Sequence, residues 1–346
     1  MTTVYLVRHA QAEGNYYRRA QGHYNGSPTE LGYRQIAALA RRFENTHFDA
    51  VYASDLARTN ATALSVYWTH GLPLHTDPAF REVGIGVWEN KPWAHIQLLD
   101  PESLTRFNTD CTHFRVEGGE TIPAARDRFM AGLRRVIAAH PNGTVAIFAH
   151  GIVLRMVIGT LQGLTDDEIN RTGHVENTSV TKLEAENGAI RVLYRDDASH
   201  LGAELISTRT QAWTRDPRGF ESGTWYEPNG RGGFTARSTE GELIGTVALG
   251  GIEGRTAILG ELRLEESARG KNLALRLIGQ AIAAAREQGC DTLRCTVARD
   301  NARGAQLALR DGFVPVGETA EGVVYEKFFD YTEEYGIKKL QEVMGK

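Results

Sequence analysis

Short apolar runs rich in β-branched residues alternate with longer amphipathic stretches up to about residue 200, and this alternation most constrains the fold. The runs TVYLVR and TVAIFA suit strands buried on both faces, whereas Ile36, Leu39 and Phe43 recur at helical spacing. Strands alternating with helices form a mostly parallel sheet covered on both sides, so we predict a three-layer α/β domain. Strands are predicted over residues 3–8, 49–54, 144–149, 179–186 and 189–195, and helices over 28–45, 55–68, 121–140 and 152–163, with Thr29, Asp55 and Thr121 as N-caps.

Polar side chains stand where three of these predicted strands end. Arg8 and His9 follow the first strand directly. Arg58 comes a few residues after the second strand, and His150 ends the third. Because the ligand crevice of an open α/β sheet lies beyond the carboxyl ends of its strands, we predict that these four side chains converge on one ligand site.

Two arginines beside a histidine favour phosphate chemistry. The planar guanidinium group of arginine can donate two parallel hydrogen bonds to two oxygens of one phosphate. Burial and the positive field of the arginines should hold the pKa of His9 below its ordinary value of about 6.5, which leaves a free imidazole nitrogen at neutral pH. Such a nitrogen can attack a phosphoryl group in line and form a phosphohistidine that water discharges.

The departing oxygen needs a proton, and a carboxyl group is the usual source. The segment FREVGIGVWEN supplies Glu82. Taken alone, an arginine–histidine pair at a strand end is more often structural, and a single glutamate is more often a solvated side chain. The functional interpretation therefore depends on their occurring together.

Composition changes sharply after His200. All 11 histidines lie at or before this residue, and glycine becomes frequent between Gly219 and Gly254. A chain of 346 residues also exceeds the usual size of a single core. We therefore predict a first domain over residues 1–202, a linker over 203–222 and a second domain over 223–346.

The second domain has a different pattern. Residues 233–251 contain two alternating strands joined by a Glu-Gly turn, and residues 269–289 form an amphipathic helix ended by Gly289. These features predict an α+β domain in which antiparallel strands flank one long helix. The remaining predicted elements are strands over 255–266, 292–298, 313–318 and 323–329 and helices over 301–311 and 332–343.

Composition excludes several classes of function. The formal net charge of -4 gives no basic field for nucleic acid, and no window has the roughly 18 apolar residues of a membrane span. The N-terminus lacks a signal-peptide pattern, so we expect a cytoplasmic protein. Cys111, Cys290 and Cys295 have no metal-ligand spacing and are expected to be reduced structural thiols.

Six ordered segments of the first domain resemble motifs of the histidine phosphatase superfamily, the phosphoglycerate mutase-like enzymes. They are LVRHAQAEGN, SPTELGYRQ, YASDLARTNATA, FREVGIGVWEN, EGGETIPAARDRF and IFAHGIVLR. The resemblance implies a metal-independent site in which His9 is phosphorylated and Glu82 donates the proton. It also implies phosphate binding by Arg8, Asn15, Arg58 and a cationic His150, and substrate contacts from Gln21 and Gly22. Ala10 departs from the family, which usually has glycine after the histidine.

The length of chain between the acid and the second histidine favours hydrolysis. Glu82 and His150 are 68 positions apart, a short interval that resembles the phosphatase branch. The expected function is hydrolysis of a small phosphorylated metabolite, with specificity set by residues 91–120, including Trp93, Phe107 and Phe114. A mutase and a non-catalytic sensor of phospho-ligands or CoA remain the alternatives.

Residues 255–313 resemble the acetyl-CoA site of the GNAT acetyltransferases. Amides at a helix N-terminus bind pyrophosphate, and small residues allow its close approach. Asn272 stands where the family has its central glycine, and asparagine tolerates a left-handed backbone. The resemblance assigns acetyl-CoA binding to Leu262, Leu264, Arg269, Gly270, Lys271, Asn272, Leu273, Ala274 and Asn301.

Two departures leave the activity of this domain open. Ala308 stands where the family often has a tyrosine acid. The chain before the first hairpin is also too short for the complete first strand and the two helices that normally shape the acceptor pocket. Glu261 is a candidate base or a structural carboxylate. The domain is an acetyltransferase, a CoA-binding regulatory module, or a vestigial domain used for packing or dimer contact, and a homodimer is compatible with both resemblances.

Overall fold

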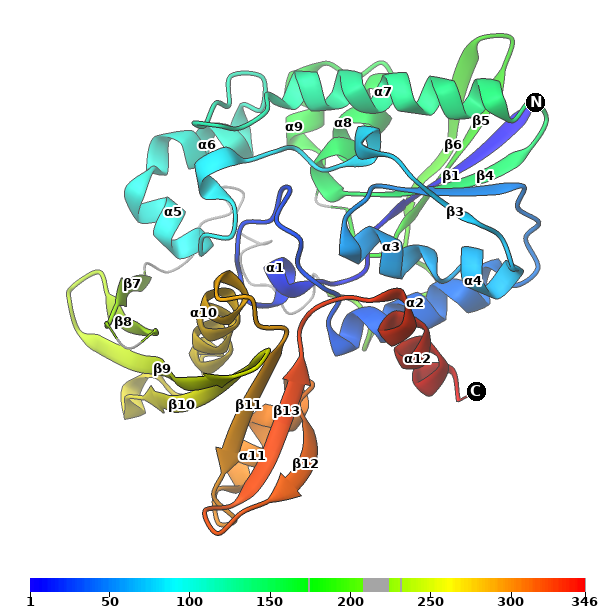
Figure 1. The fold of residues 1–346 in the computed structure, drawn as a ribbon. Coiled ribbons are helices and arrows are strands. Elements are labelled where there is room, and N and C mark those ends of the chain that lie inside the picture. Colours follow the sequence, from blue (N-terminus) through cyan, green and yellow to red (C-terminus); the bar gives the residue numbers. More distant parts are fainter. Residues whose placement is uncertain (174, 208–223, 231, 346) are drawn as a thin grey trace.

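The computed structural model describes residues 1–173, 175–207, 224–230 and 232–345, which form two sheets (Figure 1). The strands of the first sheet are β1 (Thr2–Arg8), β2 (Ala50–Ala53), β3 (Leu74–Thr76), β4 (Thr144–Ala149), β5 (Val180–Glu186) and β6 (Ala189–Asp197). They are arranged in the order β3-β2-β4-β1-β5-β6. β1 to β4 pair in parallel, whereas β5 and β6 are antiparallel additions. This arrangement confirms the predicted mostly parallel sheet.

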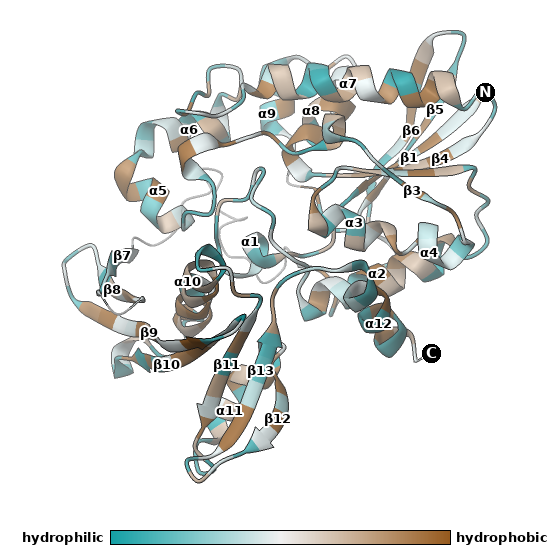
Figure 2. Ribbon diagram, in the orientation of Figure 1, coloured by the Kyte–Doolittle hydropathy of each residue, from teal (hydrophilic) through white to brown (hydrophobic). Residues whose placement is uncertain are grey.

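Helices cover both faces of the first sheet. They are α1 (Glu13–Tyr16), α2 (Glu30–Phe43), α3 (Ala57–Ala63), α4 (Tyr67–His70), α5 (Trp93–Leu99), α6 (Pro101–Thr109), α7 (Ile122–Ala139), α8 (Gly151–Leu161) and α9 (Asp166–Arg171). Along β4, Ile147 joins the core formed with α7 and α8, whereas Phe148 joins the core formed with α2 and α3. The banded colouring of α7 in Figure 2 reflects its one buried face.

Two of the three predicted helix caps are present. The hydroxyls of Thr29 and Thr121 accept hydrogen bonds from first-turn amides of α2 and α7. Asp55 does not cap α3, so that prediction is wrong. Its carboxylate instead binds the Arg81 guanidinium, and Leu56 occupies the N-cap position.

The second sheet is built from seven strands: β7 (Thr224–Pro228), β8 (Phe234–Ser238), β9 (Leu243–Glu253), β10 (Thr256–Leu264), β11 (Thr292–Val297), β12 (Val314–Glu318) and β13 (Val323–Phe328). Their order is β12-β13-β11-β10-β9-β8-β7. Helices α10 (Leu273–Glu287) and α11 (Ala302–Arg310) accompany this sheet. As predicted, α10 buries Leu277, Ile278 and Ala281 in the core of this domain.

The start of the second domain contains a strand, β7, that was not among the predicted elements. β7 pairs with β8 along its whole length. β7 ends at Pro228 and β8 begins at Phe234, which leaves no length for two helices between them. Residues 208–222 of the predicted linker, and residue 223, lie outside the described residues.

The two domains share a buried polar contact. The Tyr17 hydroxyl lies 3.0 and 3.1 Å from the carboxylate oxygens of Asp311, and Lys327 Nζ donates to the Tyr17 hydroxyl at 2.8 Å. Helix α10 approaches Tyr17 closely, because a Cβ added to Gly279 would lie only 2.5 Å from the Tyr17 Cβ atom. Burial raises the pKa of both Asp311 and Tyr17.

Two further contacts bind the C-terminal part of the chain to the first domain. Arg286 of α10 bonds both carboxylate oxygens of Glu13 at 3.0 Å. The last helix, α12 (Glu333–Met344), packs on α2 and α3 and places Leu340 in the core that α2 and α3 share with the first sheet. Within the described ranges, none of the helices has the length and apolar content needed to cross a bilayer.

We expect Lys327→Met to lower the free energy of unfolding by about 3 kcal/mol, because it leaves the buried Asp311 carboxylate without its cation. The exposed Lys338→Met is the control and should change stability by about 0.5 kcal/mol or less. Urea unfolding of the full chain measures both values. Equal stabilities of the two variants would show that the contact among Tyr17, Asp311 and Lys327 contributes nothing to the free energy of unfolding.

Candidate active site

His9 lies directly after β1, and its ring has a fixed tautomer. Its Nδ1 atom is 2.7 Å from the Ala10 carbonyl oxygen. A carbonyl can only accept a hydrogen bond, so Nδ1 carries the proton and Nε2 keeps its lone pair. Burial first, and then the charges of Arg58 and Arg8, hold the pKa of His9 well below its ordinary value. The imidazole is therefore neutral and nucleophilic at neutral pH.

Arg58 projects from α3 and is completely buried. Its Nη1 and Nη2 atoms donate to the carbonyls of Tyr24 and Gly22 at 2.8 and 2.7 Å. Its Nε atom donates to His150 Nδ1 at 3.2 Å. Arg58 thus joins the loop that follows α1 to the end of β4.

His150 faces His9, with ring centroids 5.3 Å apart. Its Nδ1 accepts from Arg58, so its Nε2 carries the proton and donates to Ser54 Oγ at 2.8 Å. Burial, followed by the charge of Arg58, holds the pKa of His150 well below its ordinary value. The structure therefore gives a neutral His150 instead of the expected cationic one, because Arg58 donates to the nitrogen that would take the second proton.

Arg8 brings a positive charge to the first turn of α8. Its Nη1 atom donates to the Val175 carbonyl, whereas its Nε atom is buried and has no hydrogen-bond partner. A Cβ added to Gly151 would lie 3.1 Å from that Nε atom. Glycine thus allows the guanidinium to lie against the helix N-terminus, where an anion is favoured.

Glu82 is oriented by backbone amides. Its carboxylate oxygens accept hydrogen bonds from Ile152 and Val153 in the first turn of α8, at 3.0 and 2.9 Å, and from Val83 at 3.1 Å. The side chain is 7% exposed and belongs to the same cavity as His9. The structure therefore brings together the predicted nucleophile and the predicted acid.

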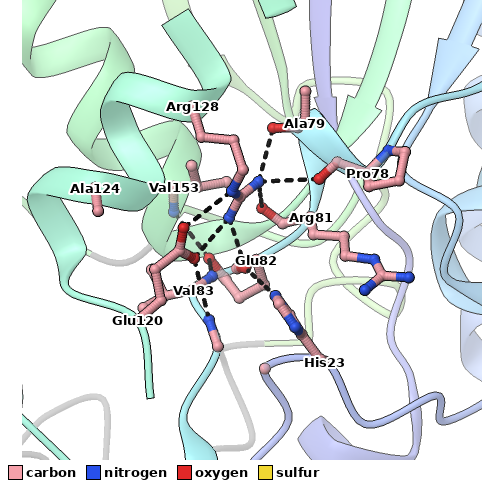
Figure 3. Close-up of polar contacts among 12 residues, drawn as sticks. His23, Pro78, Ala79, Arg81, Glu82, Val83, Glu120, Ala124, Arg128 and Val153 are labelled. Carbon is pink, nitrogen blue, oxygen red and sulfur yellow. Dashed lines mark hydrogen bonds and ion pairs between the residues drawn. The ribbon is translucent and has the colours of Figure 1, made fainter. Parts of the chain in front are cut away.

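Arg128 of α7 forms hydrogen bonds that hold the segment carrying Glu82 in position (Figure 3). Its guanidinium donates to the carbonyls of four residues in that segment and to the Glu120 carboxylate. The four carbonyls are those of Pro78, Ala79, Arg81 and Glu82. The sequence interpretation assigned Arg128 no role, although it lies in one of the six ordered motifs.

Glu89 is a second positioning residue that the sequence interpretation missed. Its carboxylate accepts hydrogen bonds from the amides of Gly22, His23 and Tyr24, at 3.2, 2.7 and 2.8 Å. Arg58 holds the carbonyls of two of these residues, Gly22 and Tyr24, from the other side. A residue that bonds backbone in this way leaves no pattern of residue types for the sequence to reveal.

A cavity of about 140 Å³ opens beside His9. Five of the predicted residues line it: Arg8, His9, Asn15, Gln21 and Glu82. Arg58, His150 and Gly22 do not line the cavity. Additional lining comes from Gly14, Arg18, Arg19, Trp93, Leu104, Phe107, Asn108, Gly151, Ile152, Arg155 and Val175.

The predicted specificity segment contributes two of its three aromatic residues. Trp93 of α5 and Phe107 of α6 line the cavity, whereas Phe114 is fully buried behind them. Asn15 Oδ1 accepts from the Ala12 amide at 3.1 Å, and Gln21 Oε1 accepts from the Gly14 amide at 2.7 Å. The Gln21 Nε2 atom is buried without a partner, as a group poised for a ligand would be.

The second domain contains an uncapped helix N-terminus after β10. Gly270 has φ +79° with open space around it, and Asn272 has φ +59°. The left-handed backbone that the sequence analysis expected asparagine to tolerate is therefore present. The Asn272 side chain makes no capping bond to α10, so first-turn amides are left for an anion. Residues 269–274 fit the pyrophosphate of acetyl-CoA on these grounds.

Other predicted residues of this domain have protein partners. Asn301 caps α11 by accepting from the Gly304 amide at 2.9 Å. Glu261 accepts from Thr246 Oγ1 at 2.7 Å, and Ala308 is buried. Leu262 and Leu264 lie on β10, beyond the last pairing of β10 with β11 at Ile258.

Two family models match this chain. The model of the histidine phosphatase superfamily (branch 1) matches residues 4–198, more than half of the chain, and that of the acetyltransferase (GNAT) family matches residues 200–313. The chain therefore belongs to the histidine phosphatase superfamily, with a GNAT domain fused to its C-terminal side.

Several individual relatives cover a little more than half of this chain. A "Probable phosphoglycerate mutase GpmB" from Yersinia pestis is 32% identical over 187 residues, 53% of this chain and 85% of that protein. The structure of Bacillus stearothermophilus YhfR is 29% identical and has a TM-score of 0.56, covering 58% of this chain and 99% of its own. A mycobacterial glucosyl-3-phosphoglycerate phosphatase with VO3 shares the fold, with 24% identity, coverage of 57% and 99%, and a TM-score of 0.53.

We expect His9 to stay neutral on acidification to well below pH 6.5, because its folded pKa is lowered by burial and by two arginines. Arg58→Gln removes one of those charges and should raise the pKa of His9. NMR of ¹⁵N-labelled histidine reports both titrations. Arg42→Gln is the matched control: it should raise the pKa of His200 from about 4 and leave His9 unchanged. An ordinary titration of His9 in the unsubstituted protein would contradict the assignment.

Proposed function

We propose that the first domain hydrolyses phosphomonoesters through a phosphohistidine at His9. The observation that carries this proposal is the hydrogen bond from His9 Nδ1 to the Ala10 carbonyl, which leaves Nε2 with a lone pair beside Arg8 and Glu82. A cavity of about 140 Å³ suits a small phosphorylated metabolite.

Two proton transfers complete the proposed reaction. Arg8 holds the phosphoryl oxygens while His9 Nε2 attacks phosphorus. The bond from phosphorus to the ester oxygen breaks, and a protonated Glu82 gives its proton to that oxygen. Water then attacks the phosphorus of the phosphohistidine, Glu82 takes a proton from that water, the bond from phosphorus to Nε2 breaks, and inorganic phosphate leaves.

The role proposed for His150 depends on the bound phosphoryl group. A dianion beside His150 would favour its protonated form, opposite to the effect of Arg58 in the free site. Phosphate binding and protonation of His150 are thus coupled in this proposal. Arg58 would act mainly by holding His150 and the carbonyls of residues 22 and 24.

A mutase is the second candidate, supported by the relative named as a probable phosphoglycerate mutase. It would return the phosphoryl group to a second hydroxyl of the substrate instead of to water. The short interval between Glu82 and His150 favours hydrolysis. Release of inorganic phosphate, measured against formation of an isomeric ester, distinguishes the two reactions.

For the second domain, we propose acetyl-CoA binding at residues 269–274, with Leu262, Leu264 and Asn301 alongside, and transfer of the acetyl group to an amine. The bound cofactor would supply an acetyl thioester. The amides of α10 and the positive charges of Arg269 and Lys271 would bind its phosphates. With Ala308 in place of a tyrosine, Glu261 is the candidate base.

We expect His9→Ala to reduce phosphate release by about a thousandfold or more, because no other group can form the intermediate. Glu82→Gln should slow an alkyl phosphate by about a hundredfold and 4-nitrophenyl phosphate much less, since only the alkoxide needs the proton. Steady-state kinetics of the full chain test both expectations.

Glu117→Gln, a substitution of an exposed glutamate outside the cavity, is the control for these measurements. It should leave both rates unchanged. Hydrolysis that persists in His9→Ala would rule out the phosphohistidine. Equal losses for both esters in Glu82→Gln would rule out the proton donor.

We expect Gly270→Ala to weaken acetyl-CoA binding at least tenfold, because it strains the left-handed backbone of the proposed phosphate loop. Gly289→Ala is a matched control, since Gly289 also has φ +79° and open space but lies at the other end of α10. Calorimetric titration with acetyl-CoA measures both affinities. Binding without acetyl transfer to amines would indicate a regulatory module, and no binding would indicate a packing role.

A further inference from the structure

Arg155 is a buried cation without a partner in the cavity beside His9. It projects from α8, is 8% exposed, and has a buried Nε atom without a hydrogen-bond partner. Within the described ranges of the chain, its guanidinium makes no hydrogen bond or ion pair. Buried arginines are normally paired, so this one lacks a group that an anion would supply.

Neighbouring charges do not supply that group. The charged and titratable side chains that influence Arg155 are Cys111, Glu82 and Arg195. Cys111 is a buried thiol whose pKa is raised by burial. The Glu82 oxygens already accept from the amides of Val83, Ile152 and Val153. A buried cation in these surroundings is costly until an anion reaches it.

Arg155 and Arg8 belong to the same cavity. Gly151, which contacts Arg8, is four residues before Arg155, so the two α8 positions share a helix face about 6 Å apart along the axis. Arg8, Arg155 and His9 all line the cavity, so an anion that reaches Arg155 would lie in the same cavity as the nucleophile.

Part of the wall of this cavity is apolar. Trp93, Leu104, Phe107 and Val175 line the same cavity. Apolar walls exclude water and strengthen an ion pair formed inside them. They also suit a substrate with a hydrophobic or aromatic body better than a strongly hydrated one.

We propose that Arg155 binds a second anionic group of the substrate, so that the first domain selects phosphomonoesters carrying a carboxylate or a further phosphate. This inference rests on the proposed phosphatase function for the position of the scissile phosphate. Arg155 acts in binding and specificity, and it takes no part in bond breaking.

The test compares two aryl esters of similar size. One is 4-carboxyphenyl phosphate, and the other is 4-(hydroxymethyl)phenyl phosphate, which lacks the second charge. Their affinities for the full-length His9→Ala protein are measured by calorimetry, with and without Arg155→Gln. We expect Arg155→Gln to weaken binding of the carboxylate ester by about ten- to a hundredfold, the range for a charge-assisted hydrogen bond, and the neutral ester by less than about threefold.

Two further variants separate recognition from a structural role. Arg155→Lys keeps the charge and should restore part of the preference for the carboxylate ester. Arg135→Gln, on the solvent face of α7, should leave both affinities unchanged. The thermal midpoint of Arg155→Gln should equal or exceed that of the unsubstituted chain, because an unpaired buried charge has been removed.

Equal weakening of both esters, or no weakening of either, would overturn the proposal, as would a lower thermal midpoint combined with unchanged discrimination. The result is independent of turnover, because His9→Ala binds the esters without cleaving them. Failure of the unsubstituted protein to hydrolyse either ester would count against the phosphatase proposal, while the affinities would still decide whether Arg155 reads a second anion.

Discussion

The buried guanidinium of Arg58 is the interaction on which the rest of the phosphatase site depends. Its three donors reach two carbonyls of the loop after α1 and one nitrogen of His150. Burial, together with the charge of the same guanidinium, lowers the pKa values of His9 and His150. One side chain thereby holds the loop and contributes to the neutral state of both histidines. Glu89 completes this brace by binding the amides of the same loop.

A parallel sheet explains how much of this site could be predicted. Arg8, His9 and His150 follow strands that lie side by side, so their convergence follows from the order of strands and helices. The roles of Arg128 and Glu89 could not be predicted, because they bind backbone groups of segments distant in the sequence. The neutral state of His150 likewise depends on which of its nitrogens faces Arg58. Tertiary packing decides which hydrogen-bond partners these side chains find, and the order of residue types in the sequence does not reveal it.

The structure of the second domain was also predictable only in part. Its hairpin, its long helix and the left-handed Asn272 followed from turn chemistry and helical spacing. The strand β7 did not, because five residues next to a glycine-rich segment give too weak a period to identify a strand. Asp55 failed as a predicted cap for a related reason: Arg81, 26 residues later, binds its carboxylate.

The short segment that carries Asn15 is held from both sides. Glu13 binds Arg286 of α10, and Tyr17 binds Asp311 and packs against Gly279. Gly14 and Asn15, which lie between these two anchors, line the cavity beside His9. The GNAT domain therefore supports this segment from outside the first domain, whether or not it transfers acetyl groups. Because Tyr17, Glu13 and Asp311 are buried by this contact, separating the domains would expose polar groups and release this segment together.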